Sequence, residues 1–402
     1  MIGVDQVAKV RELLRRKDPS VRRAALDVVD SWAGRACTPA AAVAVLDAAT
    51  LVYPEVPGVV AHPDEVWVRL LWHHPSSVPS GDVLRVYGLA GDRVRRALLH
   101  LLALRADDEA LDALVELLGD ERRAIQLPTP SYVTLAPVLE HDDALRLVPA
   151  LVELSTRPGW AWEAAGALRQ MELDGRLGHA QRRAVVDGVV PVVRTLADSC
   201  DRASALGGER VDVARADRER LRVLSALLAV MPGEESSLAL YRMLSSADPK
   251  VAAHAAVALV ARAEPVAPER LGLLARDAVA RVDLYEGLMA EGVLTEVPPL
   301  FDDKVAMAES ELVRWLSAPT ELGRHPDEIE YVGPYTVVAD DGPEALHLFR
   351  FRMRAPHWSS PRGWLIGAAG RWAHSVYLAE DDCPLDAHVA QLLDSMATWD
   401  TD

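Results

Sequence analysis

The sequence predicts a mainly helical protein, with an array of antiparallel helix pairs over residues 1–300 and a small α+β module over residues 301–402. Amphipathic stretches of helical period recur from residue 4 to about 318, separated by short breaks that contain Pro, Gly or Asp. The chain of 402 residues is 50% apolar but only 5% aromatic, which suits closely packed helices with small side chains. After about residue 300 the pattern changes to the alternation typical of strands.

The clearest helix lies in "DPSVRRAALDVVDSW". Asp18 can cap a helix that begins at Pro19, where a missing N–H costs nothing. The arginines Arg22 and Arg23 fall outside the apolar stripe of this helix. We expect the buried stripe to comprise Val21, Ala24, Ala25, Val28 and Trp32.

The same pattern returns twice along the chain. "DPKVAAHAAVALVARA" repeats the cap, the proline and the first apolar position at Asp248, Pro249 and Val251. "GDRVRRALLHLLAL" is a weaker copy, in which Val94 aligns with Val21 and Gly91 takes the cap position. The aligned valines are 73 and 157 residues apart, close to two and four units of about 37 to 39 residues, which favours a helical repeat.

These residues resemble the HEAT-repeat family, whose second helix commonly opens with Asp-Pro-x-Val-Arg-x-Ala-Ala. The resemblance is strongest at 18–25, good at 248–256 and partial at 91–98. It implies a right-handed α-solenoid of antiparallel helix pairs, with a curved surface that holds another macromolecule in most relatives.

Residues 199–217, "SCDRASALGGERVDVARAD", interrupt the periodicity. They predict a loop that projects from the array, or else an ordinary extended connection. Further on, "DDKVAMAESELVRWLSAP" predicts one more helix.

The C-terminal module is expected to hold three or four strands with flanking helices. "PYTVVAD" and "LHLFRFRM" predict strands joined through Asp341-Gly342-Pro343, and "GWLIGAAG" and "HSVYLAE" could be two more. "PLDAHVAQLLDSMATW" predicts a closing helix.

The net charge and the cysteines indicate which partners and which cellular compartment to expect. A net charge of −17 argues against a protein that mainly coats nucleic acid, and it favours a basic partner. The cysteines Cys37, Cys200 and Cys383 are far apart and match no metal spacing, which indicates a reducing cytoplasm. No signal-peptide core or membrane-spanning run occurs in the sequence. The preference for Arg over Lys, with much Ala, Val and Pro, suggests a GC-rich bacterial genome.

The sequence contains none of the common catalytic or cofactor motifs. It lacks the phosphate-binding loop, the dinucleotide fingerprint, the His-Glu-x-x-His pair and the Gly-x-Ser-x-Gly elbow. "WHHP" at 72–75 suits a helix C-terminus, and acidic runs such as 107–109 and 142–143 suit helix starts. We therefore expect no catalytic residue, metal or cofactor.

The stretch "LHLFRFRMRAPHW" at 346–358 is the main candidate for a binding site. Arg350, Arg352 and Arg354 would form a guanidinium row on one face of a strand. Together with His357, Trp358, Arg371 and Trp372, this row could hold a phosphate or an acidic peptide. The alternative is internal pairing of the row with flanking acids, namely Glu321, Asp327, Glu328 and Glu330, or Glu380, Asp381 and Asp382.

Trp160 and Trp162 are a second candidate. They could form an aromatic contact on the concave surface of the array. They could equally pack between repeats, because large aromatics supply core area in an alanine-rich stack.

The function expected from these features is a non-enzymatic, protein-binding adaptor or scaffold with a basic partner. An acidic inhibitor or immunity-type protein would have the same features. A HEAT-like DNA-binding or DNA-repair protein, such as the alkylpurine DNA glycosylases, is a further alternative, although the net charge argues against nucleic acid as a partner. A small-molecule enzyme with a site around His325, His357 and Arg371 is another. The oligomeric state stays open.

Overall fold

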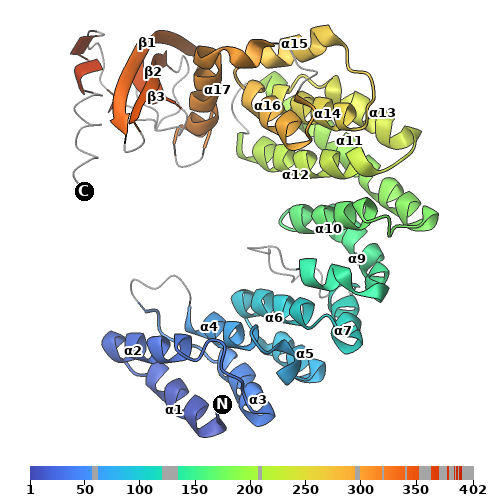
Figure 1. The fold of residues 1–402 in the computed structure, drawn as a ribbon, viewed down its shortest axis with the longest axis vertical. Coiled ribbons are helices and arrows are strands. Elements are labelled where there is room, and N and C mark those ends of the chain that lie inside the picture. Colours follow the sequence, from blue (N-terminus) through green and yellow to red (C-terminus); the bar gives the residue numbers. More distant parts are fainter. Residues whose placement is uncertain are drawn as a thin grey trace. The chain divides into compact units, whose positions relative to one another are not determined.

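The computed structural model describes residues 1–56, 62–119, 135–206, 211–294, 299–318, 321–339, 342–352 and 364–370, with scattered positions between 378 and 391. It is mainly helical, with a small antiparallel sheet near the C-terminus (Figure 1). The chain divides into two compact units, Met1–Val189 and Val190–Asp402, each of which is described by itself. The division therefore falls inside a helix, and the composition change near residue 300 lies within the second unit.

The first unit consists of helices that pack in two layers. Helices α1, α3 and α5 contact one another in succession, and so do α2, α4 and α6, while α1 packs on α2, α3 on α4 and α5 on α6. The helices of this unit are α1 (Val4–Leu14), α2 (Pro19–Asp30), α3 (Pro39–Ala49), α4 (Pro63–Leu71), η1 (Pro75–Ser77), α5 (Ser80–Leu89), α6 (Asp92–Arg105), α7 (Asp108–Gly119), η2 (Ala136–Glu140), η3 (Asp142–Leu147), α9 (Val148–Ser155), α10 (Ala161–Leu173) and the start of α11 (His179–Leu206).

The second unit repeats this arrangement. Helix α13 packs on α14 and α15 on α16, while α12, α14 and α16 lie side by side and α17 follows α16. The bounds are α12 (Val211–Val230), α13 (Glu234–Leu244), α14 (Pro249–Ala261), α15 (Pro268–Arg276), α16 (Arg281–Ala290), η5 (Pro299–Asp302) and α17 (Lys304–Leu316).

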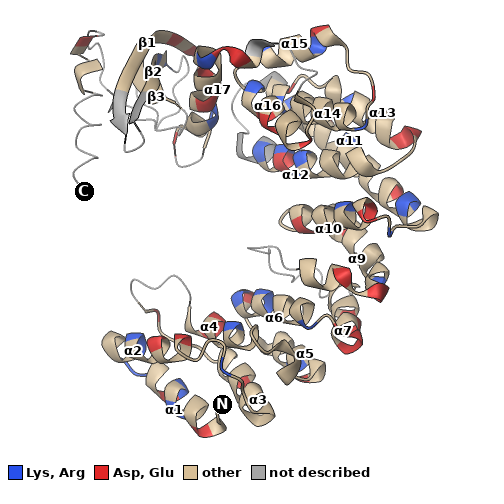
Figure 2. Ribbon diagram, viewed as in Figure 1, with Lys and Arg blue, Asp and Glu red and all other residues tan. Residues whose placement is uncertain are grey.

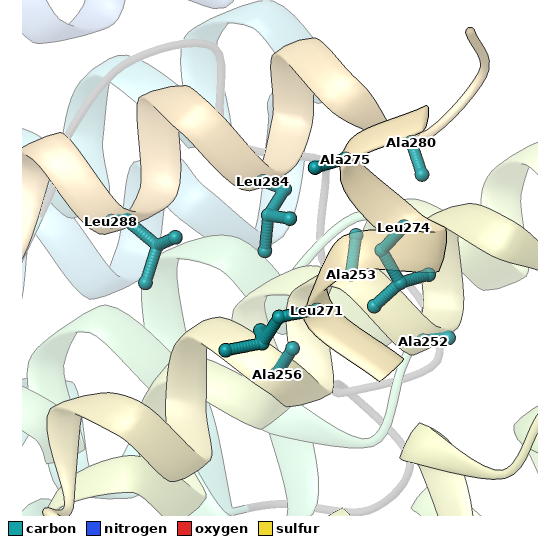
Figure 3. Close-up of a cluster of buried hydrophobic side chains, with 9 residues drawn as sticks. All are labelled: Ala252, Ala253, Ala256, Leu271, Leu274, Ala275, Ala280, Leu284 and Leu288. Carbon is teal, nitrogen blue, oxygen red and sulfur yellow. The ribbon is translucent and has the colours of Figure 1, made fainter. Parts of the chain in front are cut away.

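Small side chains let the helices of the second unit approach closely. Alanines of α14 meet leucines of α15 and α16 in one buried cluster (Figure 3). Gly287 of α16 lies against Val257 of α14, where an added Cβ would be 2.7 Å from a Val257 methyl carbon. The alanine-rich composition therefore acts through short distances between helices.

The two strong copies of the sequence motif begin helices as expected. Asp18 caps α2 by accepting a hydrogen bond from the Ser20 N–H at 2.9 Å. Asp248 caps α14 in the same way through the N–H groups of Lys250 and Val251. These caps are confirmed.

The buried face of α2 differs from the expected stripe. Ala25 and Trp32 are buried, but Ala24 is exposed and Val28 is 39% exposed. Leu26, Val29 and Arg22 are buried in their place. The assignment of Ala24 and Val28 to the core was wrong, because α2 is rotated so that Arg22 faces inward.

The burial of Arg22 has a specific cause. Its guanidinium donates hydrogen bonds to the carbonyl oxygens of Arg16 and Lys17, just beyond the end of α1, and to that of Glu55. Arg95 donates in the same way to the Tyr87 carbonyl near the end of α5. Arg281 donates to the carbonyls of Ala275 and Arg276 at the end of α15. In each case an arginine in the first turn of one helix satisfies carbonyls that the end of the preceding helix leaves without partners.

The sheet has the strand order β1-β2-β3-β4 and is antiparallel throughout. Its strands are β1 (Glu328–Ala339), β2 (Gly342–Arg352), β3 (Trp364–Ala369) and the two-residue β4 (Leu378–Ala379). Phe349 and Phe351 pack with Leu312 and Leu316 of α17 on one face. Leu348 and Ile366 are buried on the other face. All four expected strands are present, although β1 begins six residues earlier than predicted; the closing helix falls largely outside the described residues.

The expectation of a projecting loop or an extended connection over residues 199–217 was wrong for most of that segment. Helix α11 continues to Leu206 and α12 begins at Val211, so both ends of this segment are helical; residues 207–210 lie outside the described residues. Asp201 explains part of the difference, because its carboxylate accepts hydrogen bonds from Ser246 and Ala247 and so ties α11 to the segment before α14. No helix in the described part of the chain is long and apolar enough to cross a membrane.

Candidate binding surfaces

The arginine row lies on β2, on the face opposite α17. Arg350 and Arg352 alternate with the buried Phe349 and Phe351, as the strand pattern predicts. Both guanidinium groups lie over the ring of Trp364 on the neighbouring strand, at 4.4 and 4.7 Å from its centroid. The structure thus brings together two arginines and an aromatic ring that the sequence had not singled out.

The two arginines differ in their partners. Arg352 forms an ion pair with Glu328, which faces it across β1 and β2, with an N–O distance of 2.5 Å. Arg350 has no hydrogen bond or ion pair to any described residue, and its Nε is buried without a partner. Glu330, its partner in the strand register, is exposed.

The remaining residues of this candidate site lie outside the described residues, namely Arg354, His357, Trp358, Arg371 and Trp372. So do the acids Glu380, Asp381 and Asp382 that could have paired with the row. The described part of the site is therefore the Arg350–Trp364–Arg352 stack with Glu328.

The two tryptophans at the start of α10, Trp160 just before the helix and Trp162 within it, occupy different environments. Trp160 is only 4% exposed, so it packs inside the first unit and is not available as a surface contact. Trp162 is 53% exposed. Helical spacing explains the difference, since residues two apart point to different sides of a helix.

A charged surface on the second unit was missed in the sequence. Lys250 of α14 lies 3.6 Å from Asp283 of α16, and Arg314 of α17 lies 2.8 Å from Glu286 and 2.7 Å from Glu311. We call these five residues the α16–α17 acidic face; acidic and basic residues of α17 are marked in Figure 2. Because three carboxylates face two cations, one negative charge is in excess.

The pKa of Glu311 reflects this crowding. Burial raises the pKa of Glu311, Arg314 opposes the rise, and the carboxylates of Glu286 and Asp283 add to it. A further cation beside Glu311 would relieve both the burial cost and the repulsion. No sequence pattern indicates this surface, because its members come from three helices.

His325 lies in the segment between α17 and β1. Burial lowers the pKa of His325 to about 4, and Lys250 and Arg218 add to the effect. Its Nδ1 is 2.6 Å from the Ser317 hydroxyl, which itself donates to the Val313 carbonyl. The imidazole therefore donates its Nδ1–H to Ser317 and ties this segment to the last turn of α17. The other members of the hypothetical enzyme site, His357 and Arg371, lie outside the described residues.

Within the described ranges, no group of three His, Cys, Asp or Glu side chains has an arrangement that could hold a metal ion. Neither Cys37 nor Cys200 forms a disulfide with a residue that the structure describes, and burial raises the pKa of the Cys200 thiol to about 12. A thiol with so high a pKa is a poor nucleophile at neutral pH.

Comparison with known proteins assigns no family. No family model matches the chain, and no curated protein matches it. Among solved structures, a crystal structure of an engineered protein from the Northeast Structural Genomics Consortium is similar at 19% sequence identity, with 78% of this chain and 79% of that chain covered. Its TM-score of 0.28 is too low to carry an argument about fold.

Proposed function

We propose that the protein is a HEAT-like, non-enzymatic adaptor that binds a basic protein partner. The observation that carries the proposal is the layered packing of successive helix pairs, in which α2, α4 and α6, and again α12, α14 and α16, lie side by side. Layers of this kind offer broad, polar helix surfaces, which repeat proteins use to bind other macromolecules.

The arginines that cap preceding helices support the HEAT-like part of the proposal. Arg22, Arg95 and Arg281 each stand four residues after Asp18, Gly91 and Asp277, respectively. Arg95 follows Arg22 by 73 residues and Arg281 follows it by 259 residues, which are about two and seven units of 37 residues. One recurring position with a similar contact favours a repeat of common geometry, and we propose that its helix pairs stack with the right hand of the HEAT family.

The α16–α17 acidic face supports a basic partner. Its excess negative charge, half-buried in the case of Glu311 and exposed in the case of Glu286, would be completed by a lysine or arginine of a partner. The net charge of −17 would steer such a partner from a distance. Cys37 and Cys200, which form no disulfide with a described residue, suit a reducing compartment such as the cytoplasm. An inhibitor of a basic protein is a special case of this function.

The test is co-purification of the tagged full chain from cells that express it natively. We expect a basic protein to be retained in stoichiometric amount and to be identified by mass spectrometry. The Glu286→Gln/Glu311→Gln variant should lose it, whereas the matched Glu234→Gln/Glu235→Gln variant on α13, with two exposed acids and the same charge change, should keep it. Equal retention by both variants would exclude this face as the contact, and absence of a stoichiometric partner would argue against the adaptor itself.

A further inference from the structure

Helix α14 is recessed within the side-by-side helix layer of the second unit. It packs between α12 and α16, and none of its 13 residues is exposed. Exposed side chains of the two neighbouring helices flank it, with Glu219 and Arg222 on α12 and Glu286 and Met289 on α16. A partner segment that lies along α14 would therefore be held between side chains of α12 and α16.

One stripe of α14 faces this recess. Lys250, His254, Val257 and Ala261 are three or four residues apart, so they share one side of the helix, and all four are partly exposed. The alanines that alternate with them are buried against α15 and α16 (Figure 3). His254 therefore lies at the floor of the recess, one turn after Lys250.

The His254 side chain is polar, partly buried and without a hydrogen bond to any residue that the structure describes. Burial lowers the pKa of His254 and Asp283 opposes the change, so the imidazole is neutral at pH 7. A neutral imidazole offers one N–H donor and one nitrogen acceptor. Leaving such a group without a partner costs stability, which favours a role for it in binding.

Helix packing does not require a histidine at this repeat position. His254 stands six residues after the capping residue of α14, and the same position is Ala24 in the first copy of the motif and Ala97 in the weaker copy. On α16 the corresponding residue is Asp283, six residues after Asp277. Because α14 and α16 lie side by side, His254 and Asp283 occupy one row across the layer.

The charges around His254 are balanced. Lys250 pairs with Asp283 at 3.6 Å, and Arg222 pairs with Glu219 at 3.0 Å. These four groups are the charges that act on the imidazole. A group that His254 binds is therefore expected to be uncharged. A peptide amide has this character, because it carries one donor, one acceptor and no net charge.

We propose that an extended segment of the basic partner lies along α14, with one of its peptide amides bound to His254. The inference rests on the proposed function and specifies the kind of segment and its contact. An extended segment leaves its amides available, whereas those of a helix are bonded within the helix. Packed helix axes are about 8 to 10 Å apart, so a lysine or arginine beside that amide would reach Glu286 of the α16–α17 acidic face.

Binding of the co-purified basic partner to His254 variants tests the inference, with affinities measured by isothermal titration calorimetry. We expect His254→Ala to weaken binding about fivefold or more, because one hydrogen bond to the partner is lost. His254→Asn should stay within about twofold of the unaltered chain, because its carboxamide keeps a donor and an acceptor without charge. Thermal unfolding of His254→Ala should show no loss of stability, since alanine suits this repeat position.

The matched control is His179→Ala, which removes an exposed histidine at the start of α11 and should bind like the unaltered chain. The inference is overturned if His254→Ala binds as tightly as the unaltered chain, or if His254→Asn binds as weakly as His254→Ala. Either result leaves the proposed function standing, provided that the Glu286→Gln/Glu311→Gln variant loses the partner. Absence of a stoichiometric partner would overturn the proposed function and the inference together.

Discussion

The Arg281 guanidinium at the start of α16 lies 2.7 Å from the carbonyl oxygen of Ala275 in the last turn of α15. A second hydrogen bond joins it to the Arg276 carbonyl at 2.7 Å, and a third reaches the Ala306 carbonyl in the first turn of α17. Arg281 is 5% exposed. One buried cation thus connects three successive helices through their backbone.

We expect Arg281→Met to destabilise the second unit by about 2 to 4 kcal/mol, because it leaves several buried carbonyl groups without partners. The exposed neighbour Arg276 is the control, and Arg276→Met should cost less than about 0.5 kcal/mol. Urea unfolding measures both effects. Equal stability of the two variants would mean that the carbonyl contacts contribute little.

Two glycine-to-alanine substitutions, one on α16 and one on α15, test the close packing of α14 and α16. Gly287→Ala should lower stability by about 1 to 2 kcal/mol, because its new methyl group would overlap Val257. Gly272→Ala on α15, where the nearest atom is the flexible end of Arg276 at 3.7 Å, should raise stability by about 0.5 to 1 kcal/mol. Thermal unfolding of both variants provides the comparison. A stabilising Gly287→Ala would show that the helices can separate freely.

Much of the helical architecture could be predicted from the sequence. Asp18 and Asp248 each stand directly before a proline. Because the capping residue, the proline and the first valine are close together in the sequence, both helix starts could be predicted. Arg22 was misplaced because its burial depends on carbonyl groups of another helix, which a periodic pattern does not contain. Arg281 could have been found from its spacing of four residues after Asp277, as for Arg22 after Asp18.

The surfaces were harder to predict than the helices. The alternation of arginines and apolar residues around Arg350 predicted the two faces of β2 correctly. The stacking of Arg350 on Trp364 could not be predicted in this way, because it depends on the pairing of β2 with β3 and the two residues are 14 positions apart. The α16–α17 acidic face joins Lys250 to Arg314 through residues of a third helix. Such constellations follow from tertiary packing, so no local signal marks them.

The pKa of His325 predicts a loss of stability in mild acid. The folded-state pKa of about 4 lies below the ordinary value of 6.5, so the unfolded chain binds the proton first as the pH falls. Between pH 7 and pH 5 this residue should lower the free energy of unfolding by roughly 2 kcal/mol. His325→Gln should remove that part of the pH dependence. Parallel stability curves for the two proteins between pH 7 and pH 5 would contradict the assignment.

The two arginines of β2 should respond differently to substitution. Arg352→Met loses the ion pair with Glu328 and should cost about 0.5 to 1 kcal/mol. Arg350→Met loses a similar contact with Trp364 but also removes a buried N–H without a partner, so its net effect should be within about 0.5 kcal/mol of zero. A double-mutant cycle with Glu328→Gln should show coupling to position 352 and none to position 350. Coupling to position 350 would mean that Glu328 serves both arginines.

The salt dependence of partner binding tests electrostatic steering. If the charge of −17 attracts a basic partner, the association rate should fall at least tenfold between 20 mM and 300 mM salt, with a smaller change in the dissociation rate. Biolayer interferometry with the co-purified partner measures both rates. An association rate that does not change with salt would exclude steering by the net charge.

Hydrogen–deuterium exchange of the full chain, with and without the co-purified basic partner, tests the central claim most directly. The account predicts slower exchange in α14, α16 and α17 on binding, with α13 and α15 unchanged. Protection confined to α13 and α15, or none in either set of helices, would contradict the claim that the partner binds the side-by-side helix layer.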